Sequence, residues 1–412
     1  MGNYSNIPEI SKERILDKNI SISIHQILQA AYKNNFAIAA WKNVRKHDIQ
    51  VIVDTSDSYK DPLHPELESM DPGFLVSPFL NDSNHLNFLI RADIHFKGKN
   101  SKRLYYQIPD AYRETTDISN FINSLPTTSL EINPEFYTNV VDDKPNTYKK
   151  EFIHLVQLAV DYIKNNIFLK VVPSRRETIN LPDHFNIANT YVKLTEKYPY
   201  AFVSLFSIPG QGTWMGASPE VLVEMDEYGI FRTSAVAGTQ SGDKMTDLSS
   251  VAWTQKEIEE QALVSRYIIN CFKKIRLREF EEYGPKTIRA GNLVHLKTDF
   301  TVDINEVNFS QLGSVMLKLL HPTSAVCGMP KESSLDFIKS KENYDREFYS
   351  GYLGPVNIDK HTSLFVNLRC AQLLDGKAYL YAGAGITVDS NPEKEWNETL
   401  IKNQTIREIL TM

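Results

Sequence analysis

The feature that most constrains the fold is a succession of short, strand-like apolar runs in the C-terminal two thirds of the chain. From Ile167–Val172 onward these runs alternate with a few helical patterns, without a regular strand–helix–strand rhythm. A regular rhythm would indicate a parallel sheet, so its absence favours an α+β fold with mainly antiparallel strands. The length of 412 residues allows two to three domains, or one large sheet-based domain with a long N-terminal extension.

The N-terminal third carries fewer signals. Residues 1–145 contain strand-like runs at Gln50–Val53 and Phe88–Ile90, separated by a turn-rich segment. After a polar stretch, apolar residues recur at helical spacing from Phe152 to Ile163, with Asn146 or Thr147 as the expected N-cap. We therefore predict that residues 1–145 form a scaffold portion and residues 146–412 the catalytic region.

Composition excludes several classes of protein. A hydrophobic fraction of 42% argues against disorder, and a net charge of −6 argues against a nucleic-acid partner, which requires a concentrated basic face. The three cysteines form no CxxC pair, which favours a reduced, cytoplasmic setting. We find no secretory signal and no membrane-spanning run, so we expect a protein without a membrane partner.

Two pairs of glutamates lie at helical spacing. Glu257 and Glu260 are three residues apart in one helical pattern, and Glu395 and Glu398 in another, so each pair shares one helix face. Two such faces brought together would form an all-oxygen site suited to Mg²⁺. The alternative is two ordinary solvated helices, because this spacing occurs often by chance.

Lys170 is unusual within its strand-like run. Strand alternation places it on the same side as Phe168 and Val172. A lysine held among apolar groups has a lowered pKa and can act as a base near neutral pH. The alternative is an edge-strand lysine that reaches solvent.

Two glycine segments follow predicted strands. Gly383 and Gly385 come after one strand, and Gly238–Thr239 comes after another. We predict a turn at each, where backbone N–H groups can approach an anion closely. No dinucleotide-binding or P-loop motif is present.

Together these segments resemble the chorismate-utilising enzymes, and among them most closely the isochorismate synthases. The similarity covers roughly residues 147–412. Eight motifs occur in the family's order: KVVPSR (Lys170–Arg175), GASPEVLV (Gly216–Val223), SAVAGT (Ser234–Thr239), HPTSAVCGMP (His321–Pro330), YDREFYSGYLG (Tyr344–Gly354), NLRCA (Asn367–Ala371), YAGAGI (Tyr381–Ile386) and PEKEWNETLIK (Pro392–Lys402). The resemblance implies a single large α+β domain of layered, mainly antiparallel sheets with helices packed outside, and chorismate as the substrate.

The resemblance also assigns the chemistry. Lys170 matches the general base that activates water for attack at C2 of chorismate, and Glu220 matches the general acid that protonates the departing C4 hydroxyl. Such a pair needs a base without its proton and an acid that keeps one, which requires opposite environments in one pocket.

The same resemblance implies the ligand set. Glu260 and Glu398 match direct Mg²⁺ ligands, and Glu257 and Glu395 match ligands that act through water. The metal would offset the repulsion between four carboxylates and a dianionic substrate. The positions that match substrate-binding residues are Gly238, Thr239, His295, Ala325, Tyr349, Arg369, Gly385 and Lys402.

Two positions favour isochorismate formation. Lys170 is the base that anthranilate synthases lack, and Ala325 stands where amine-adding relatives and salicylate synthases carry threonine. The alternatives are a salicylate synthase, which goes on to eliminate pyruvate, and a catalytically inactive anion-binding relative. The resemblance further implies a monomer whose product feeds menaquinone, siderophore or salicylate synthesis.

Overall fold

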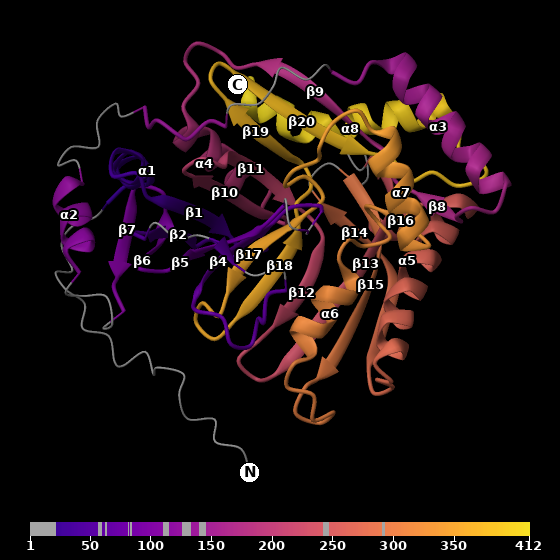
Figure 1. Ribbon diagram of the computed structural model, residues 1–412, viewed down its shortest axis with the longest axis horizontal. Helices are drawn as coiled ribbons and strands as arrows, with labels where there is room; N and C mark the ends of the chain where they lie inside the picture. Colours follow the sequence, from indigo (N-terminus) through magenta and orange to yellow (C-terminus); the bar gives the residue numbers. More distant parts are fainter. Residues whose placement is uncertain are drawn as a thin grey trace.

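Strands from distant parts of the chain pair into two antiparallel sheets of nine strands each, shown in Figure 1. The computed structural model describes residues 22–56, 60–61, 64–80, 82, 85–109, 115–125, 133–139, 146–241, 247–290 and 293–412. The order of the first sheet is β7 (Arg103–Gln107), β6 (Ile94–Asn100), β2 (Ile49–Asp54), β1 (Ala37–Lys42), β10 (Phe202–Ile208), β11 (Gly212–Ser218), β19 (Cys370–Leu374), β20 (Lys377–Gly383) and β9 (Ser174–Asn180).

The second sheet has the same number of strands but a different mixture of chain segments. Its order is β14 (Glu281–Ala290), β15 (Leu293–Asp303), β13 (Ile230–Ser241), β12 (Val221–Met225), β18 (Thr362–Val366), β17 (Tyr352–Val356), β4 (Gly73–Ser77), β5 (Asn87–Arg91) and β3 (Lys60–Asp61). The expected antiparallel α+β fold is therefore confirmed. The predicted strands Gln50–Val53 and Phe88–Ile90 fall in β2 and β5, so the N-terminal region contributes strands to both sheets.

Helices cover the outer faces of the sheets (Figure 1). The described residues form eight: α1 (Ile24–Lys33), α2 (Thr116–Ser124), α3 (Lys149–Lys164), α4 (Ile187–Lys197), α5 (Gln255–Lys274), α6 (Leu312–Leu320), α7 (Lys331–Lys341) and α8 (Pro392–Leu410). Helices α1, α4 and α8 contact the first sheet, whereas α5 and α6 contact the second. Within the described residues, no helix combines the length and the apolar character needed to cross a membrane.

An aromatic core fills the space between the two sheets. Trp41 and Phe202 from the first sheet meet Phe74 and Phe365 from the second, and all four side chains are almost fully buried. The rings of Phe202 and Phe365 stack at a centroid distance of 4.1 Å. Such buried aromatic pairs contribute packing energy beyond the area they remove from water, so they hold the two sheets together.

Several local predictions differ from the structure. The turn expected at Gly383 and Gly385 is absent, because Gly383 is the last residue of β20 and no turn follows at Gly385. The strand expected at Ile167–Val172 is reduced to β8 (Lys170–Val171), which pairs with β16 (Gly328–Met329) in a sheet of two strands. Its partner is this short because the next residue, Pro330, has no N–H to donate. At the start of α3 the expected caps are wrong, because Tyr148 occupies the N-cap and Glu151 accepts from its backbone N–H.

Another difference concerns the predicted turn at Gly238–Thr239. The chain continues through these residues as β13, with a shift in register against β15 between Ala237 and Gln240. Gly238 has a φ of +69°, which an L-residue with a side chain adopts only at a cost. The glycine therefore allows a bulge inside a strand rather than a reversal of the chain.

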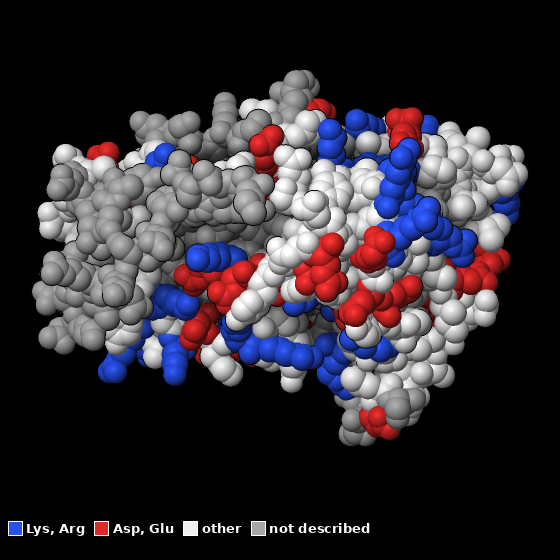
Figure 2. Space-filling view, turned by 90° about the horizontal axis from the view of Figure 1, so that it is seen from below, with Lys and Arg blue, Asp and Glu red and all other residues white. Residues whose placement is uncertain are grey.

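The surface mixes charges of both signs. On the face shown in Figure 2, acidic and basic side chains lie close to one another among the described residues. Other charged side chains, among them Lys170 and Glu220, are buried inside the molecule.

Candidate active site

Lys170 is a buried cation at the junction of several elements. Its side chain has no exposed surface, and its Nζ donates to Oε1 of Glu260 on α5 at 2.8 Å. Its backbone is fixed by the pairing of β8 with β16 and by Ser334, whose hydroxyl donates to the Lys170 carbonyl. The alternative of a lysine that reaches solvent from an edge strand is therefore wrong.

Glu220 lies in the short connection between β11 and β12. Its backbone carbonyl accepts from the N–H of Val366, and its side chain is only 5% exposed. Thr323 donates a long hydrogen bond of 3.5 Å to Oε1 of Glu220. Burial raises the pKa of Glu220 to about 7, against the opposing charges of Lys170, Arg369 and Lys402. A substantial fraction of this carboxyl therefore keeps its proton at neutral pH.

The pKa of Glu260 shifts in the opposite direction to that of Glu220. Burial alone would raise its pKa, but the charge and hydrogen bond of Lys170, together with Lys402 and Lys256, lower it overall. Glu260 is therefore ionised near neutral pH. The charge of Lys170 thus acts on two carboxyl groups whose pKa values shift in opposite directions.

Arg369 provides free donors in the same region. It stands just before β19 with a φ of +50°, and its guanidinium has no hydrogen-bond or ion-pair partner among the described residues. Burial lowers its pKa, and Tyr349, Glu398 and Glu220 act in the opposite direction. A part-buried guanidinium without a partner favours an anionic ligand, and its planar fork matches a carboxylate.

Tyr349 and His295 lie close to this charge network. Burial raises the pKa of Tyr349 to about 12, and its ring stacks on Tyr381. His295 on β15 donates from Nδ1 to the Gly238 carbonyl at 2.8 Å, and burial lowers its pKa to about 4. Both side chains are therefore neutral polar groups at physiological pH.

The glycines bring backbone close to charged groups. A Cβ at Gly385 would lie 2.6 Å from Oε1 of Glu260 and 3.1 Å from Cε of Lys170, so a side chain there would displace these two groups. A Cβ at Gly238 would lie 3.2 Å from the ring of Trp253. Thr239 lies in β13, and its side chain is outside the described atoms. Ala325 is half-buried and packs against a hydrophobic core cluster that includes Val326 and Met316.

Helices α5 and α8 place three of the four glutamates around lysines. Glu395 forms an ion pair with Lys256, and Glu398 forms one with Lys402 at 2.6 Å. The charge of Lys256 is also coupled to Glu398 and Glu260. The Glu395 side chain is 2% exposed, so the alternative of two ordinary solvated helices is wrong for this position.

Glu257 lies apart from that group. It closes a capping box at the start of α5, where it accepts from the N–H of Thr254 at 2.7 Å, and it also accepts from the amide of Gln240. Its position here is that of a helix cap.

The donor set has the chemistry that Mg²⁺ prefers, since it consists of carboxylate oxygens on two helices that the Lys256–Glu395 ion pair joins. Among the described residues, no three His, Cys, Asp or Glu side chains are grouped closely enough to hold a metal as they stand. Lys256 supplies positive charge to Glu395, Glu398 and Glu260 instead. In the described structure lysines therefore balance the charge of these glutamates.

Two residues of the candidate site, Lys256 and Thr323, were not predicted from the sequence. Lys256 precedes Glu260 by four residues on α5, a spacing that places an ammonium beside a carboxylate and that the sequence displays. Thr323 lies two residues before Ala325, yet its contact with Glu220 spans 103 residues. Only the first of these had a signal in the local sequence.

With the geometry established, comparison identifies the family. Residues 98–411, more than half of the chain, match the family described as chorismate binding enzyme. The chain belongs to this family.

Curated relatives of the chain carry the names of two different enzymes. The chain is 32% identical to the salicylate biosynthesis isochorismate synthase of Pseudomonas aeruginosa, over 61% of this chain and 53% of that protein. It is 27% identical to anthranilate synthase component 1 of Aquifex aeolicus, over 66% of this chain and 56% of that protein. The match thus spans about half the length of each relative.

The fold agrees with a solved structure over nearly its whole length. MenF, the menaquinone-specific isochorismate synthase from Escherichia coli, superposes with a TM-score of 0.70 at 21% identity, covering 93% of this chain and 91% of that one. At this identity the likeness supports the fold, and the residues of the site must support the reaction.

Proposed function

We propose that this protein is an isochorismate synthase, which converts chorismate to isochorismate. The observation that carries the proposal is a buried amine, Lys170, near a buried carboxyl, Glu220, whose pKa is raised to about 7. An acid that keeps its proton beside an amine matches the two proton transfers of the reaction.

The reaction balances with these two groups. The Lys170 amine takes a proton from water, and the water oxygen bonds to C2 of the ring. The ring double bonds shift, the bond from C4 to its hydroxyl breaks, and Glu220 gives its proton to the departing oxygen. One water is consumed and one is released, so the net change is an isomerisation without an oxidant or reductant.

The substrate's carboxylates need partners of opposite charge. Arg369, which has no partner among the described residues, is the proposed donor to the enolpyruvyl carboxylate, with the Tyr349 hydroxyl and the backbone of Gly385 beside it. Lys402 donates to the Gly383 carbonyl at 2.9 Å and is the proposed neighbour of the ring carboxylate, with Gly238 and Thr239. His295 and Ala325 would border the ring.

Glu260 and Glu398 are the proposed direct Mg²⁺ ligands, with Glu257 and Glu395 acting through water. A bound Mg²⁺ supplies positive charge for the ring carboxylate and for these glutamates. In the described structure Lys170 donates to Glu260, so its amine is committed to an ion pair. For Lys170 to act as the base, its amine would have to leave this ion pair and lose its proton, and a bound Mg²⁺ would supply the counter-charge that Glu260 then needs.

Product analysis tests the proposal. Purified protein is incubated with chorismate and Mg²⁺, and the products are separated and identified. Isochorismate alone is expected, and Lys170→Ala should abolish its formation. Absence of turnover under all conditions would indicate an inactive anion-binding relative, and an unchanged Lys170→Ala rate would remove Lys170 as the base.

Salicylate synthesis is the second candidate. Ala325 disfavours it, because its methyl group cannot position a proton or a water as a hydroxyl can. Salicylate together with pyruvate from the unmodified protein would favour this candidate. An Ala325→Thr variant that gains salicylate formation would show that this position directs the step after water addition.

A further inference from the structure

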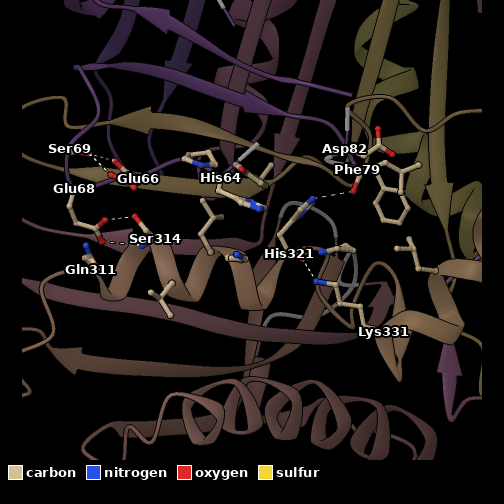
Figure 3. A pocket seen from close by; sticks show the side chains of 18 of the residues that line it. His64, Glu66, Glu68, Ser69, Phe79, Asp82, Gln311, Ser314, His321 and Lys331 are labelled. Atoms are coloured by element: carbon tan, nitrogen blue, oxygen red, sulfur yellow. Dashed lines mark hydrogen bonds between the residues drawn. The ribbon is translucent and has the colours of Figure 1, made fainter. Parts of the chain in front are cut away.

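A cavity of about 560 Å³ lies outside the candidate active site, between α6, α7 and the segment around residues 64–82. Figure 3 shows it from close by, with Glu66 and Glu68 at one end and Lys331 at the other. Its volume falls within the range of about 300–1,000 Å³ that is typical of small-molecule sites. None of the residues assigned above to catalysis, substrate or metal lines it.

The walls of the cavity are mainly apolar and are held in place. Phe79, Leu335 and Pro322 contribute apolar surface. The segment that forms one wall is tied to the start of α6, where the Glu68 carboxylate accepts from the backbone N–H and the hydroxyl of Ser314. These bonds fix the shape of the cavity and leave Glu68 occupied.

The acidic groups of the lining already have partners. Besides Glu68, Asp82 accepts from Nδ1 of His85 at 2.8 Å, and the net effect of the two carboxylates around His85 is to raise the pKa of that histidine. Glu66 is exposed and accepts from the Ser69 hydroxyl. These three carboxylates keep their negative charge, and the positive charge of the lining comes from its lysines.

Three lysines contribute that charge without carboxylate partners among the described residues. Lys331 is half-buried, and its ammonium donates to the His321 carbonyl, a neutral acceptor that Figure 3 shows beside it. Burial lowers the pKa of Lys331. Lys318 and Lys339 stand exposed among the lining residues. A part-buried ammonium that bonds only to a carbonyl gains most from an incoming anion.

We propose that this cavity is a second ligand site, which binds a small carboxylate with a flat apolar body. The carboxylate is placed against Lys331, with Lys318 and Lys339 nearby, and the apolar body lies against Phe79 and Leu335. The floor at His321–Pro322 adjoins Thr323, which contacts Glu220. The site is therefore separate from the catalytic residues and adjacent to the loop that holds one of them.

Benzoate is a suitable probe, because it has a flat apolar ring and one carboxylate. Binding to the full-length protein is measured by titration calorimetry and by ligand-detected NMR at up to about 10 mM benzoate. We expect saturable binding, with benzamide at least about tenfold weaker because it lacks the charge.

Variants locate the binding. Lys331→Met removes the buried ammonium, and Leu335→Trp fills the cavity while keeping Lys331, so each should raise the dissociation constant at least about tenfold. The exposed double variant Lys318→Met/Lys339→Met should weaken binding several-fold with no loss of folding, which thermal melts verify for all variants. Lys341→Met is the matched control, since this exposed lysine lies on the same helix and does not line the cavity.

One further variant separates the cavity from the active site, which is also expected to bind carboxylates. Arg369→Met should leave benzoate binding in the cavity unchanged, because Arg369 does not line it. Affinity lost in Arg369→Met but retained in Lys331→Met and Leu335→Trp would overturn the proposal, and so would the absence of binding at about 10 mM. Neither result would bear on chorismate turnover, so this proposal and the proposed function can fail separately.

Discussion

The candidate active site has a glutamate on each of two sides near the same lysine, Glu220 buried and Glu260 part-buried, and their pKa values shift in opposite directions. On the β11–β12 side, burial raises the pKa of Glu220 to about 7. On the α5 side, the pKa of Glu260 is lowered even though burial opposes ionisation there as well. Lys170 contributes to both shifts, so proximity to a cation alone does not explain the difference.

Direct contact explains it. Glu260 accepts a hydrogen bond of 2.8 Å from Lys170, and Lys402 and Lys256 add positive charge. Glu220 has no ion pair among the described residues and accepts one long hydrogen bond from the neutral hydroxyl of Thr323. A charge-assisted hydrogen bond outweighs the cost of burial, whereas a more distant charge does not. One pocket can therefore hold an acid and a carboxylate at the same pH.

Removing the proton donor should have the largest effect on this contrast. Glu220→Gln keeps the shape of the side chain but cannot release a proton, so kcat should fall by roughly 10²–10⁴-fold. Steady-state rates with chorismate measure this. Glu224→Gln, on the adjacent strand β12, is the matched control and should stay near the original rate; an active Glu220→Gln enzyme would rule out Glu220 as the acid.

Removing the cation should destabilise the α5 side. Lys170→Met leaves the Glu260 carboxylate without its buried partner and should reduce the free energy of unfolding by about 3–5 kcal/mol. Denaturant unfolding without Mg²⁺ measures the change. The double variant Lys170→Met/Glu260→Gln should recover most of it, because no charge is then left unpaired. Exposed Lys164→Met is the control, and equal stability of the single and double variants would contradict the argument.

The acid should also set a limb of the pH profile. Because the raised pKa of Glu220 is about 7, its protonated fraction and the rate should fall about tenfold per pH unit well above pH 7. Its neutral form also favours the folded state below the ordinary pKa of 4.5, and this stabilisation is lost as the pH rises from about 4.5 through about 7. Rate profiles of kcat/KM test the first effect. If the residual activity of Glu220→Gln still declined above pH 7, the decline would belong to another titrating group.

The smallest expected effect is the loss of stability when Glu257, which caps α5, is replaced. Glu257→Ala removes the capping box of α5 and should cost about 1 kcal/mol of stability, measured by thermal unfolding. Exposed Glu259→Ala on the same helix should cost less, because among the described residues Glu259 accepts a hydrogen bond only from the side chain of Gln255. Equal losses of stability in the two variants would show that the capping box does not stabilise α5. Added Mg²⁺ that stabilises the original protein but not the variant would support a metal role for Glu257.

Prediction from the sequence succeeded where the signal was local. The glutamate-bearing helices follow from three-residue spacing, and the structure contains them as α5 and α8. The same approach failed at Gly238, because a bulge inside β13 depends on its pairing with β15. It also failed to give the bounds of the strand at Lys170, whose length is set by a partner that ends at a proline.

The sequence by itself determined the antiparallel α+β class, the helical faces of both glutamate pairs and the motifs that resemble the family. The tertiary structure decided which carboxyl keeps its proton and which ammonium balances each charge. The physical reason is that these contacts join distant parts of the chain: Lys170 reaches Glu260 across 90 residues, and Lys256 reaches Glu395 across 139. Burial and hydrogen bonding set a pKa, and both exist only after the chain has folded.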